Sequence, residues 1–357
     1  MSRCKLEEFI SYEQPSKYIV NSDQYDDSFE IPVLTAGKSF ILGYTDETNN
    51  IFDNLPVIIF DDFTTSVQFV DFPFKVKSSA MKLLKNTEQA DIKYCYYLLK
   101  YLQHTPENHK RQWLSTTSQK TVELPVIEEQ KNIVSKLDKI LEVIDNQNKQ
   151  LELLDEAIKA RFVEMFGDEN NSKGWEIVNI EDVANVQVGV VIKPSQYYTD
   201  QYNGIKAFRS LNIGNGYIKD DNWVYFSKEG NKKNKKSILS TNDVLVVRSG
   251  APGTACVVTS EYAGSNAIDV IIAHPDFQKV DSRYLCTYTN MSHGKSQIIE
   301  GTGGAAQQHF NVGKYNKLKL MLPPLEYQKQ YVKILEEIDK SRLLSNQSLF
   351  LIKSIIF

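Results

Sequence analysis

The chain has 357 residues, of which 41% are hydrophobic and 24% charged, with a formal net charge of −4. This length favours two domains over one compact domain. No apolar run approaches the roughly 20 residues of a membrane-spanning helix, and the opening MSRCKLEEF lacks a signal-peptide core. The cysteines are scattered without a CxxC pair, which favours a reducing cytoplasm over a disulfide framework or a zinc site.

Residues 124–166 are predicted to form one long helix after a first globular domain over residues 1–123. The helix opens with Leu-Pro, and proline suits a first helical turn because its missing N–H is not needed there. Apolar residues then recur at steps of three and four, which predicts a coiled-coil seam with Asn148 and Asp155 at two polar seam positions. A helix over 127–166 would be roughly 60 Å long and would hold two domains at a fixed distance. The apolar seam residues are Val134, Leu137, Leu141, Ile144, Leu151, Ile158 and Phe162.

A second globular domain is predicted over residues 167–321, and part of it is rich in basic and aromatic residues. Between residues 204 and 236 lysine and arginine outnumber the acidic residues and alternate with aromatic ones. Basic side chains neutralise phosphates and supply most of the non-specific affinity for nucleic acids. The run NKKNKK alone is more often a solvated loop, so its weight comes from the neighbouring residues. The DNA-binding candidates here are Arg209, Asn212, Lys232, Lys233, Lys235 and Lys236.

The apolar run VLVV leads into the glycine-rich turn RSGAPGT (248–254). An arginine at a strand end can donate two hydrogen bonds to guanine, and glycines permit close backbone approach. Corresponding loops of the first domain carry other polar side chains. Two domains that recognise different DNA sequences would be expected to differ in this way. For any single residue, a structural role in the turn is an equally good alternative. These further DNA-binding candidates are Arg248, Ser249, Thr254, Gln307 and Gln308, with Lys38, Thr64, Thr65 and Ser66 in the first domain.

The last segment, 322–357, repeats the first helix. Its opening LPPLEYQKQYVKIL matches LPVIEEQKNIVSKL (124–137), and the match continues if the second copy drops four residues, about one helical turn. Upstream, PVIIFDDFTTSVQFV parallels DVLVVRSGAPGTACVV, DIKYCYYL parallels DSRYLCTY, KLEEFI parallels NIEDVA, and STTSQK faces TGGAAQQHF. The chain is therefore predicted to be a tandem repeat of an α/β domain and a helix, with the helices paired antiparallel. The second seam comprises Val332, Leu335, Ile338, Leu349, Ile352 and Ile356.

The sequence carries no recognisable catalytic or metal-binding motif. The fragments AGKS and HGKS lack the first glycine of a P-loop, the histidines form no metal pattern, and no GxSxG elbow is present. We therefore expect neither catalytic residues nor a metal site. Two alternatives remain open: a non-catalytic coiled-coil adaptor with two domains for a non-DNA ligand, and an enzyme that uses Cys256 or Cys286 with His274 or His293.

The whole chain resembles the specificity (S) subunit of type I restriction-modification systems. The resemblance is carried by both LPxφExQK helix openings (φ is Ile or Leu), by VLVVRSGAPG, by IPVLTAGK and by GTGGAAQQHFNVGKYNKLKLMLPPLEYQ. It implies two α/β target recognition domains, 1–123 and 167–321, alternating with two conserved helices, 124–166 and 322–357, that pair as an antiparallel coiled coil. It also implies that each domain reads one half of a bipartite DNA site and that the helices set the unread spacer.

The resemblance further implies partners and cofactors. Such a subunit is not itself catalytic and binds no cofactor; it recruits two methyltransferase (M) subunits that use S-adenosylmethionine to methylate adenine N6. Two restriction (R) subunits add translocation and cleavage that require ATP and Mg²⁺, and the complex acts in the cytoplasm. The M subunits are expected to dock on an exposed face at the two helix starts, comprising Glu128, Gln130, Lys131, Glu326, Gln328 and Lys329.

Overall fold

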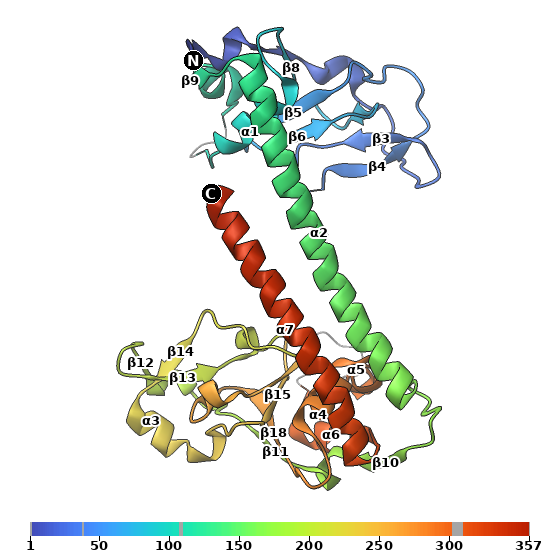
Figure 1. Cartoon of the computed structure of the whole chain (residues 1–357), viewed down its shortest axis with the longest axis vertical. Helices are drawn as coiled ribbons and strands as arrows, with labels where there is room; N and C mark the ends of the chain where they lie inside the picture. Colours follow the sequence, from blue (N-terminus) through green and yellow to red (C-terminus); the bar gives the residue numbers. More distant parts are fainter. Residues whose placement is uncertain (1, 38, 107–109, 302–309, 357) are drawn as a thin grey trace. The chain divides into compact units, whose positions relative to one another are not determined.

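A computed structural model describes residues 2–37, 39–106, 110–301 and 310–356 (Figure 1). The chain divides into two compact units, residues 1–145 (unit 1) and 146–357 (unit 2), and each is described by itself. No helix within the described ranges is long and apolar enough to cross a membrane.

Unit 1 is built on a four-stranded antiparallel sheet in the order β2-β8-β5-β6. A smaller sheet in the order β4-β3-β7 packs on one face, and α1 packs on the other. Along β5, Ile58 and Phe60 face the helix, whereas Val57 and Ile59 face the smaller sheet, as the period of two in a strand requires. The elements are β1 (Ser2–Lys5), β2 (Ile10–Glu13), β3 (Ile31–Leu34), β4 (Ile41–Thr45), β5 (Val57–Asp61), β6 (Val67–Val70), β7 (Lys75–Val76), β8 (Met81–Asn86), α1 (Ile92–Tyr101) and β9 (Thr121–Leu124), which pairs with β1.

Unit 2 repeats this architecture. Its main sheet has the order β11-β18-β15-β16, its second sheet the order β12-β14-β13-β17, and β10 pairs with β19 as β1 pairs with β9. The elements are β10 (Glu176–Asn179), β11 (Ala184–Val188), β12 (Tyr198–Thr199), β13 (Ile205–Phe208), β14 (Val224–Phe226), α3 (Lys228–Lys233), β15 (Val244–Val247), β16 (Ala255–Val257), β17 (Asn266–Ala267), β18 (Val270–Pro275), α4 (Ser282–Asn290), α5 (Ser292–Gly301), α6 (Val312–Asn316) and β19 (Lys319–Leu322). The tandem repeat of α/β domains predicted from the sequence is confirmed.

One predicted correspondence inside the repeat is wrong. The N–H of Leu6 donates to the carbonyl of Lys120, and the N–H of Ile180 donates to that of Leu318, both at 3.1 Å. Lys120 and Leu318 are therefore equivalent, and STTSQK corresponds to the segment through α6 rather than to TGGAAQQHF. Residues 302–309 of that second fragment lie outside the described residues.

The long helices are α2 (Ile127–Phe166) and α7 (Leu325–Ile356), green and red in Figure 1. Within unit 2 the end of α2 lies antiparallel to the start of α7. The ring of Tyr331 lies 5.5 Å from that of Phe162, whereas further along α7 Arg342 forms an ion pair with Asp155. The antiparallel pairing is thus confirmed for this part of the helices. Asp155 itself is not a buried seam residue, because its side chain is 63% exposed.

The predicted seam residues differ in burial. Val134 packs against the core of unit 1, and Ile158 packs against the core of unit 2, which includes Phe162 and Leu335. Leu141 is 45% exposed, so it is a weak seam position, and Ile356 lies in the part whose side chains are not described. The other seam residues are buried (Val332, Leu349) or half-buried (Leu137, Ile144, Leu151, Ile338, Ile352).

Candidate nucleic-acid interface

The start of α2 is fastened to unit 1 by the buried side chain of Gln130. Its amide oxygen accepts a hydrogen bond from the backbone N–H of Asp91 at 2.8 Å, and Asp91 is the N-cap of α1. Its amide nitrogen donates to the carbonyls of Pro125, at 2.8 Å, and of Gln89, at 3.1 Å. Because both ends of the amide are bonded inside unit 1, this side chain is part of the fold.

Gln328 makes the same three bonds at the start of α7 in unit 2. Its oxygen accepts from the N–H of Asp281, the N-cap of α4, at 2.8 Å. Its nitrogen donates to the carbonyls of Pro323, at 2.8 Å, and of Lys279, at 3.1 Å. Gln130 and Gln328 are both 0% exposed, so the prediction that they lie on an exposed docking face is wrong. The neighbours predicted with them, Glu128, Lys131, Glu326 and Lys329, are exposed.

The predicted guanine contact of Arg248 does not fit its position at the end of β15. Its guanidinium pairs with Asp269 and donates to the carbonyl of Phe310 at 3.1 Å, and its side chain is only 14% exposed. The carbonyl of Arg248 also accepts from the N–H of Phe310 at 3.2 Å. Arg248 therefore anchors the segment that leads back to β19. The other candidates of this turn, Ser249 and Thr254, are half-buried.

Asp62 does the same work in unit 1, just after β5. Its carbonyl accepts from the N–H of Gln112, and its carboxylate accepts from the N–H of Trp113, both at 2.8 Å. The carboxylate also lies 3.2 Å from the ammonium of Lys82, and both charged groups are 1% exposed. At equivalent strand ends of the two units, an acidic and a basic side chain thus make the same kind of bond, to the backbone of the segment that leads to the next strand.

Two further candidates, Thr65 and Asn212, are buried and bonded within the fold. The hydroxyl of Thr65 donates to the carbonyl of His104 at 2.6 Å, and Thr65 has a positive φ of 58°. The amide of Asn212 accepts from the N–H of Arg209 at 2.9 Å and donates to the carbonyl of Asp221 at 2.7 Å. Neither side chain is placed to contact a ligand. Arg209 itself is half-buried and donates to the carbonyl of Asn222.

The remaining first-domain candidates are less constrained. Thr64 is exposed and Ser66 is half-buried. Lys38, Gln307 and Gln308 lie outside the described residues.

Part of the basic and aromatic stretch also belongs to the fold. The ammonium of Lys206 lies 4.8 Å from the ring centroids of both Trp223 and Tyr262, and 2.7 Å from the carboxylate of Asp220. Hydrogen bonds from Lys206 and then from Trp223 hold the pKa of Asp220 below its usual value. This lysine charge is already compensated inside unit 2, so it is a poor candidate for phosphate binding.

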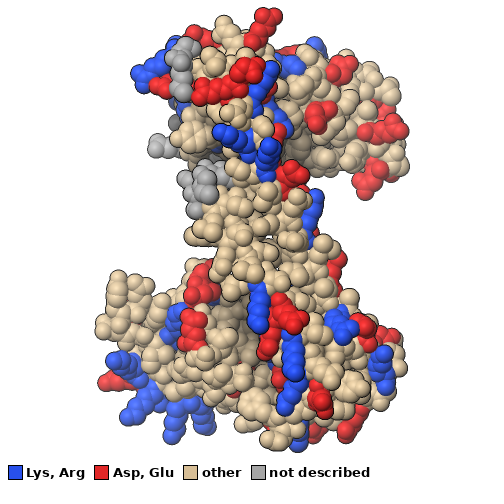
Figure 2. Space-filling model, viewed as in Figure 1, with Lys and Arg blue, Asp and Glu red and all other residues tan. Residues whose placement is uncertain are grey.

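The lysines of α3 and of the following 3₁₀ turn η7 (Lys235–Ser237) are exposed together. Figure 2 shows basic side chains gathered where Figure 1 places α3. Polyanions bind to such clusters of exposed cations. We call this group the lysine edge; it comprises Lys228, Lys232, Lys233, Lys235 and Lys236, all of them exposed.

The lysine edge is held in place by Asn266 of β17, whose side chain is fully buried. The amide nitrogen of Asn266 donates to the side-chain oxygen of Asn231 at 2.8 Å, and its oxygen accepts from the hydroxyl of Ser237 at 2.7 Å. One buried amide therefore joins α3 to η7.

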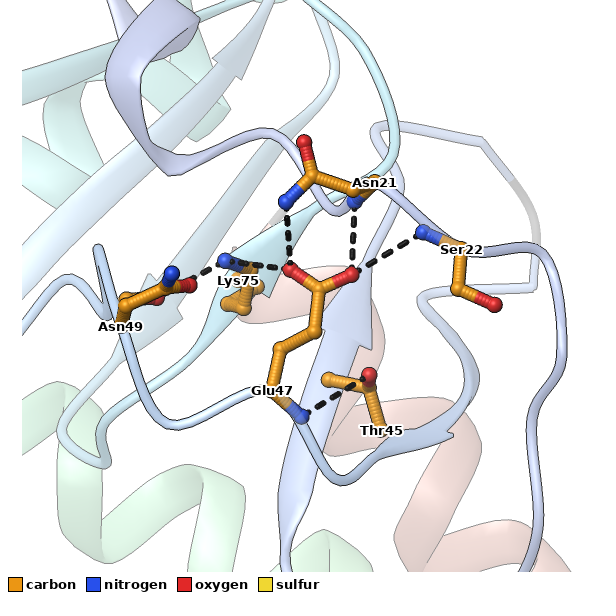
Figure 3. A network of polar contacts seen from close by, with 6 residues as sticks. All are labelled: Asn21, Ser22, Thr45, Glu47, Asn49 and Lys75. Carbon is orange, nitrogen blue, oxygen red and sulfur yellow. Dashed lines mark hydrogen bonds and ion pairs between the residues drawn. The ribbon is translucent and has the colours of Figure 1, made fainter.

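Unit 1 has a buried lysine, Lys75 of β7, where unit 2 has Asn266, since these residues pair with Val33 and Ala207 of the equivalent strands β3 and β13. Figure 3 shows its network: the ammonium of Lys75 lies 2.8 Å from the carboxylate of Glu47 and donates to a carbonyl at 2.8 Å.

Glu47 also accepts from the backbone N–H groups of Asn21, at 2.7 Å, and of Ser22, at 2.9 Å. Burial opposes ionisation of Glu47, but hydrogen bonds from Lys75 and from these N–H groups outweigh it and lower its pKa to about 2. The positive charge of Lys75 is therefore compensated by Glu47 inside unit 1.

The cysteines that the enzyme alternative requires are buried, and its histidines are hydrogen-bonded within unit 2. Burial raises the pKa of the Cys256 thiol well above its usual value and that of Cys286 to about 12, whereas a nucleophilic cysteine needs a lowered pKa. His274 is bonded to Asp243 and Gln187, and His293 to a backbone carbonyl. Within the described ranges, no group of three or more His, Cys, Asp or Glu could hold a metal ion.

Comparisons with known proteins identify the family. A family model described as "Type I restriction modification DNA specificity domain" matches residues 3–156 and 172–353. The chain is 46% identical over 146 residues to the EcoR124I/EcoR124II specificity subunit of Escherichia coli, an alignment that covers 39% of this chain and 36% of that one. It is 23% identical over 288 residues to the MjaVIII specificity subunit of Methanocaldococcus jannaschii, covering 74% of this chain and 67% of that one.

A solved structure shows the same fold. The S subunit of a type I restriction-modification system from M. genitalium superposes with a TM-score of 0.63 at 13% identity, covering 99% of this chain and 93% of that one. The aligned region spans only about a third of the length of the E. coli relative. The two matches to the family model, 3–156 and 172–353, together cover most of the present chain. The chain therefore belongs to the type I restriction-modification DNA specificity family.

Proposed function

We propose that this chain is the DNA-recognition subunit of a type I restriction-modification complex. Its two recognition domains, residues 1–123 and 167–321, would each read one half of a bipartite DNA site. The observation that carries the proposal is the repeat: units 1 and 2 share the order of the main sheet and the glutamine contact at the helix start, yet among the described residues unit 2 alone has α3 with its exposed lysines. Two like domains on one chain suit a site with two unlike halves.

The lysine edge supplies the phosphate contacts of unit 2 in this proposal. Each phosphate that a lysine neutralises releases condensed counterions, so affinity falls as salt rises. This contribution is independent of sequence and fixes the position of the domain on the duplex. Direct contacts to base edges must come from other side chains near the lysine edge.

The long helices α2 and α7 have two roles in the proposal. They set the spacing between the half-sites, and they dock two M subunits through the exposed residues at the helix starts, Glu128, Lys131, Glu326 and Lys329. The chain would then direct adenine-N6 methylation by the M subunits, or ATP-dependent cleavage when two R subunits join, without catalysing either reaction. S-adenosylmethionine, ATP and Mg²⁺ would bind to the partner subunits, in the cytoplasm.

A methylome comparison tests this function. N6-methyladenine is mapped in the host with the gene intact, deleted, and restored from a plasmid. We expect a split motif, two short half-sites around a fixed gap, to vanish on deletion and return on complementation. If the partner methyltransferase is expressed and no methylated motif depends on this gene, the chain is not a working specificity subunit.

A further inference from the structure

Residues 189–193 of unit 2 form a loop at the point where the two units follow different paths. In unit 1, Gln14 alone joins β2 to the 3₁₀ turn η2 (Pro15–Tyr18). In unit 2, residues 189–193 join β11 to the turn η5 (Pro194–Tyr197), which is not equivalent to η2: Val190, before η5, donates to the carbonyl of Ala267 as Val20, after η2, donates to that of Val76. The loop exposes two β-branched apolar side chains, Val191 at 50% and Ile192 at 79%, which we call the apolar tip.

The apolar tip stands on a fixed base. The N–H of Gly189 donates to the carbonyl of Val270 at 2.9 Å, and that of Val190 donates to the carbonyl of Ala267 at 2.8 Å. A Cβ atom on Gly189 would lie 2.4 Å from the Ala267 oxygen, so only glycine permits this approach. On the other side of the tip, Lys193 has a positive φ of 44° and its carbonyl accepts from the N–H of Gln196. The backbone thus holds the apolar side chains in water.

The base of the tip is also bonded to Asp269, the partner of Arg248. The N–H of Asp269 donates to the carbonyl of Val190 at 3.2 Å, and its carboxylate receives the guanidinium of Arg248. Arg248 therefore holds Asp269, which in turn is hydrogen-bonded to the loop at Val190. Its structural role explains why an arginine stands at this strand end without reaching outward.

The apolar tip and the lysine edge belong to one surface. The carbonyl of Tyr197, in η5, accepts from the N–H of Ser227, the N-cap of α3, at 2.8 Å. The ammonium of Lys233 lies 5.8 Å from the Tyr197 ring. On the far side, the amide of Gln187 at the end of β11 donates to the carbonyl of Lys236 at 2.5 Å. The tip is consequently an apolar projection beside a row of cations.

We propose that the apolar tip enters a groove of the DNA and packs against the bases of the half-site read by unit 2, while the lysine edge holds the neighbouring phosphates. This inference rests on the proposed function. DNA is anionic along its backbone and presents apolar surface, base faces and thymine methyl groups, inside its grooves. A rigid apolar tip beside exposed lysines complements that distribution. Burying Ile192 and Val191 against bases also removes apolar surface from water.

The central test replaces Ile192 by threonine, which keeps the branched shape and adds a hydroxyl. The methylome of a host that carries Ile192→Thr and the partner subunits is compared with the wild type. We expect one half of the split motif to be relaxed or altered and the other half to be unchanged. With the assembled complex, the ratio of affinities for cognate and unrelated duplexes should fall about tenfold or more, since one lost base contact has this weight.

Two control variants distinguish the contribution of the apolar tip to DNA recognition from that of other exposed residues of unit 2. Phe277→Ala removes an exposed aromatic ring beyond the opposite end of β18, and it should leave the motif and the affinity ratio unchanged. The double variant Lys232→Ala with Lys233→Ala should weaken binding to both duplexes equally and reduce the salt dependence by about one unit per lost phosphate contact.

The outcomes are distinct. An unchanged motif and ratio in Ile192→Thr would overturn the inference while leaving the proposed function intact. Lower methylation at every site with an unchanged motif would assign the tip to a protein partner and also overturn it. Absence of any split motif in the wild type would remove the proposed function and the inference together. Thermal melting verifies folding, and Val191→Thr, an isosteric change, replaces any variant that does not accumulate.

Discussion

Units 1 and 2 differ least where polar side chains are buried and most where the connecting segments differ in length. The glutamines at the two helix starts make the same bonds, and Asp62 and Arg248 perform one structural task with opposite charges. The segments after β2 and β11, by contrast, follow different paths, because η2 comes before the bond from Val20 to Val76 whereas η5 comes after the equivalent bond from Val190 to Ala267. A polar side chain in an equivalent turn is therefore weak evidence of base contact, whereas an exposed segment on a hydrogen-bonded base, where the two units follow different paths, is stronger evidence.

The largest expected effect on stability comes from removing the shared glutamine contact in one unit at a time. Gln130→Met and Gln328→Met keep the side-chain volume but leave an N–H and two carbonyls without their partner. Because each buried polar group left unsatisfied costs about 1–3 kcal/mol, each variant should lose about 3 kcal/mol of unfolding free energy in its own unit. Hydrogen exchange resolved by unit measures this loss.

Lys131→Met is the matched control, since it changes the exposed neighbour of Gln130. It should leave the unfolding free energy within about 0.5 kcal/mol of the wild type. A loss below 1 kcal/mol in either glutamine variant would contradict the assignment of these side chains to the fold.

A smaller effect, on the pH dependence of stability, distinguishes the network around Lys75 from that around Asn266. Of these two networks, the one in unit 1 contains a titrating carboxylate, that of Glu47. Glu47 has a folded pKa of about 2, below its ordinary 4.5. Its contribution to stability is therefore fully present above pH 4.5 and is lost as the pH falls toward 2. Glu47→Gln keeps one acceptor oxygen but replaces the other by an NH2 group and loses the charge, so it should destabilise unit 1 by about 1–2 kcal/mol at pH 7.

The measurement is the unfolding free energy of unit 1 in wild type and Glu47→Gln between pH 7 and pH 2. The difference should shrink steadily below pH 4.5. In Asn266→Asp the new carboxylate instead lies in unit 2, so the acid response of unit 1 should remain that of the wild type. A difference for Glu47→Gln that is constant over the pH range would show that the ion pair adds nothing to folding.

Sequence patterns predicted the repeat, the long helices and the exposed lysines, because periodicity and duplicated motifs follow directly from backbone geometry. They could not show which polar side chains point inward, since Arg248 or Asn212 in a turn can satisfy either the backbone or a ligand. One signal was available for the glutamines. Two domains that read different sequences need share only their scaffold, so an identical glutamine in both helix openings indicates a structural role.

The apolar tip carried no such signal. The loop that carries it, GVVIK (189–193), resembles the end of a buried strand, and the exposure of Val191 and Ile192 depends on the contact between Gly189 and Ala267, which is distant in sequence. The different paths after β2 and β11 can be seen only after the strands of the two units are matched by pairing register.

The smallest expected effect concerns α1 and α4, the equivalent helices of units 1 and 2. Lys93 of α1 lies 2.6 Å from Asp138 of α2, and Arg283 of α4 pairs with Asp339 of α7. The four side chains are 29–45% exposed, and ion pairs in this range contribute about 0–1 kcal/mol. Asp138 also accepts from the hydroxyl of Tyr97 and keeps that bond when the lysine is removed.

Lys93→Met should therefore cost less than Arg283→Met, with both below about 1 kcal/mol and both reduced in high salt. Urea unfolding followed by hydrogen exchange in each unit measures the two losses under the same conditions. A loss above 2 kcal/mol in either variant would mean that these pairs, and not the buried glutamines, fasten the long helices to their units. A larger loss for Lys93→Met than for Arg283→Met would contradict the compensating role of Tyr97.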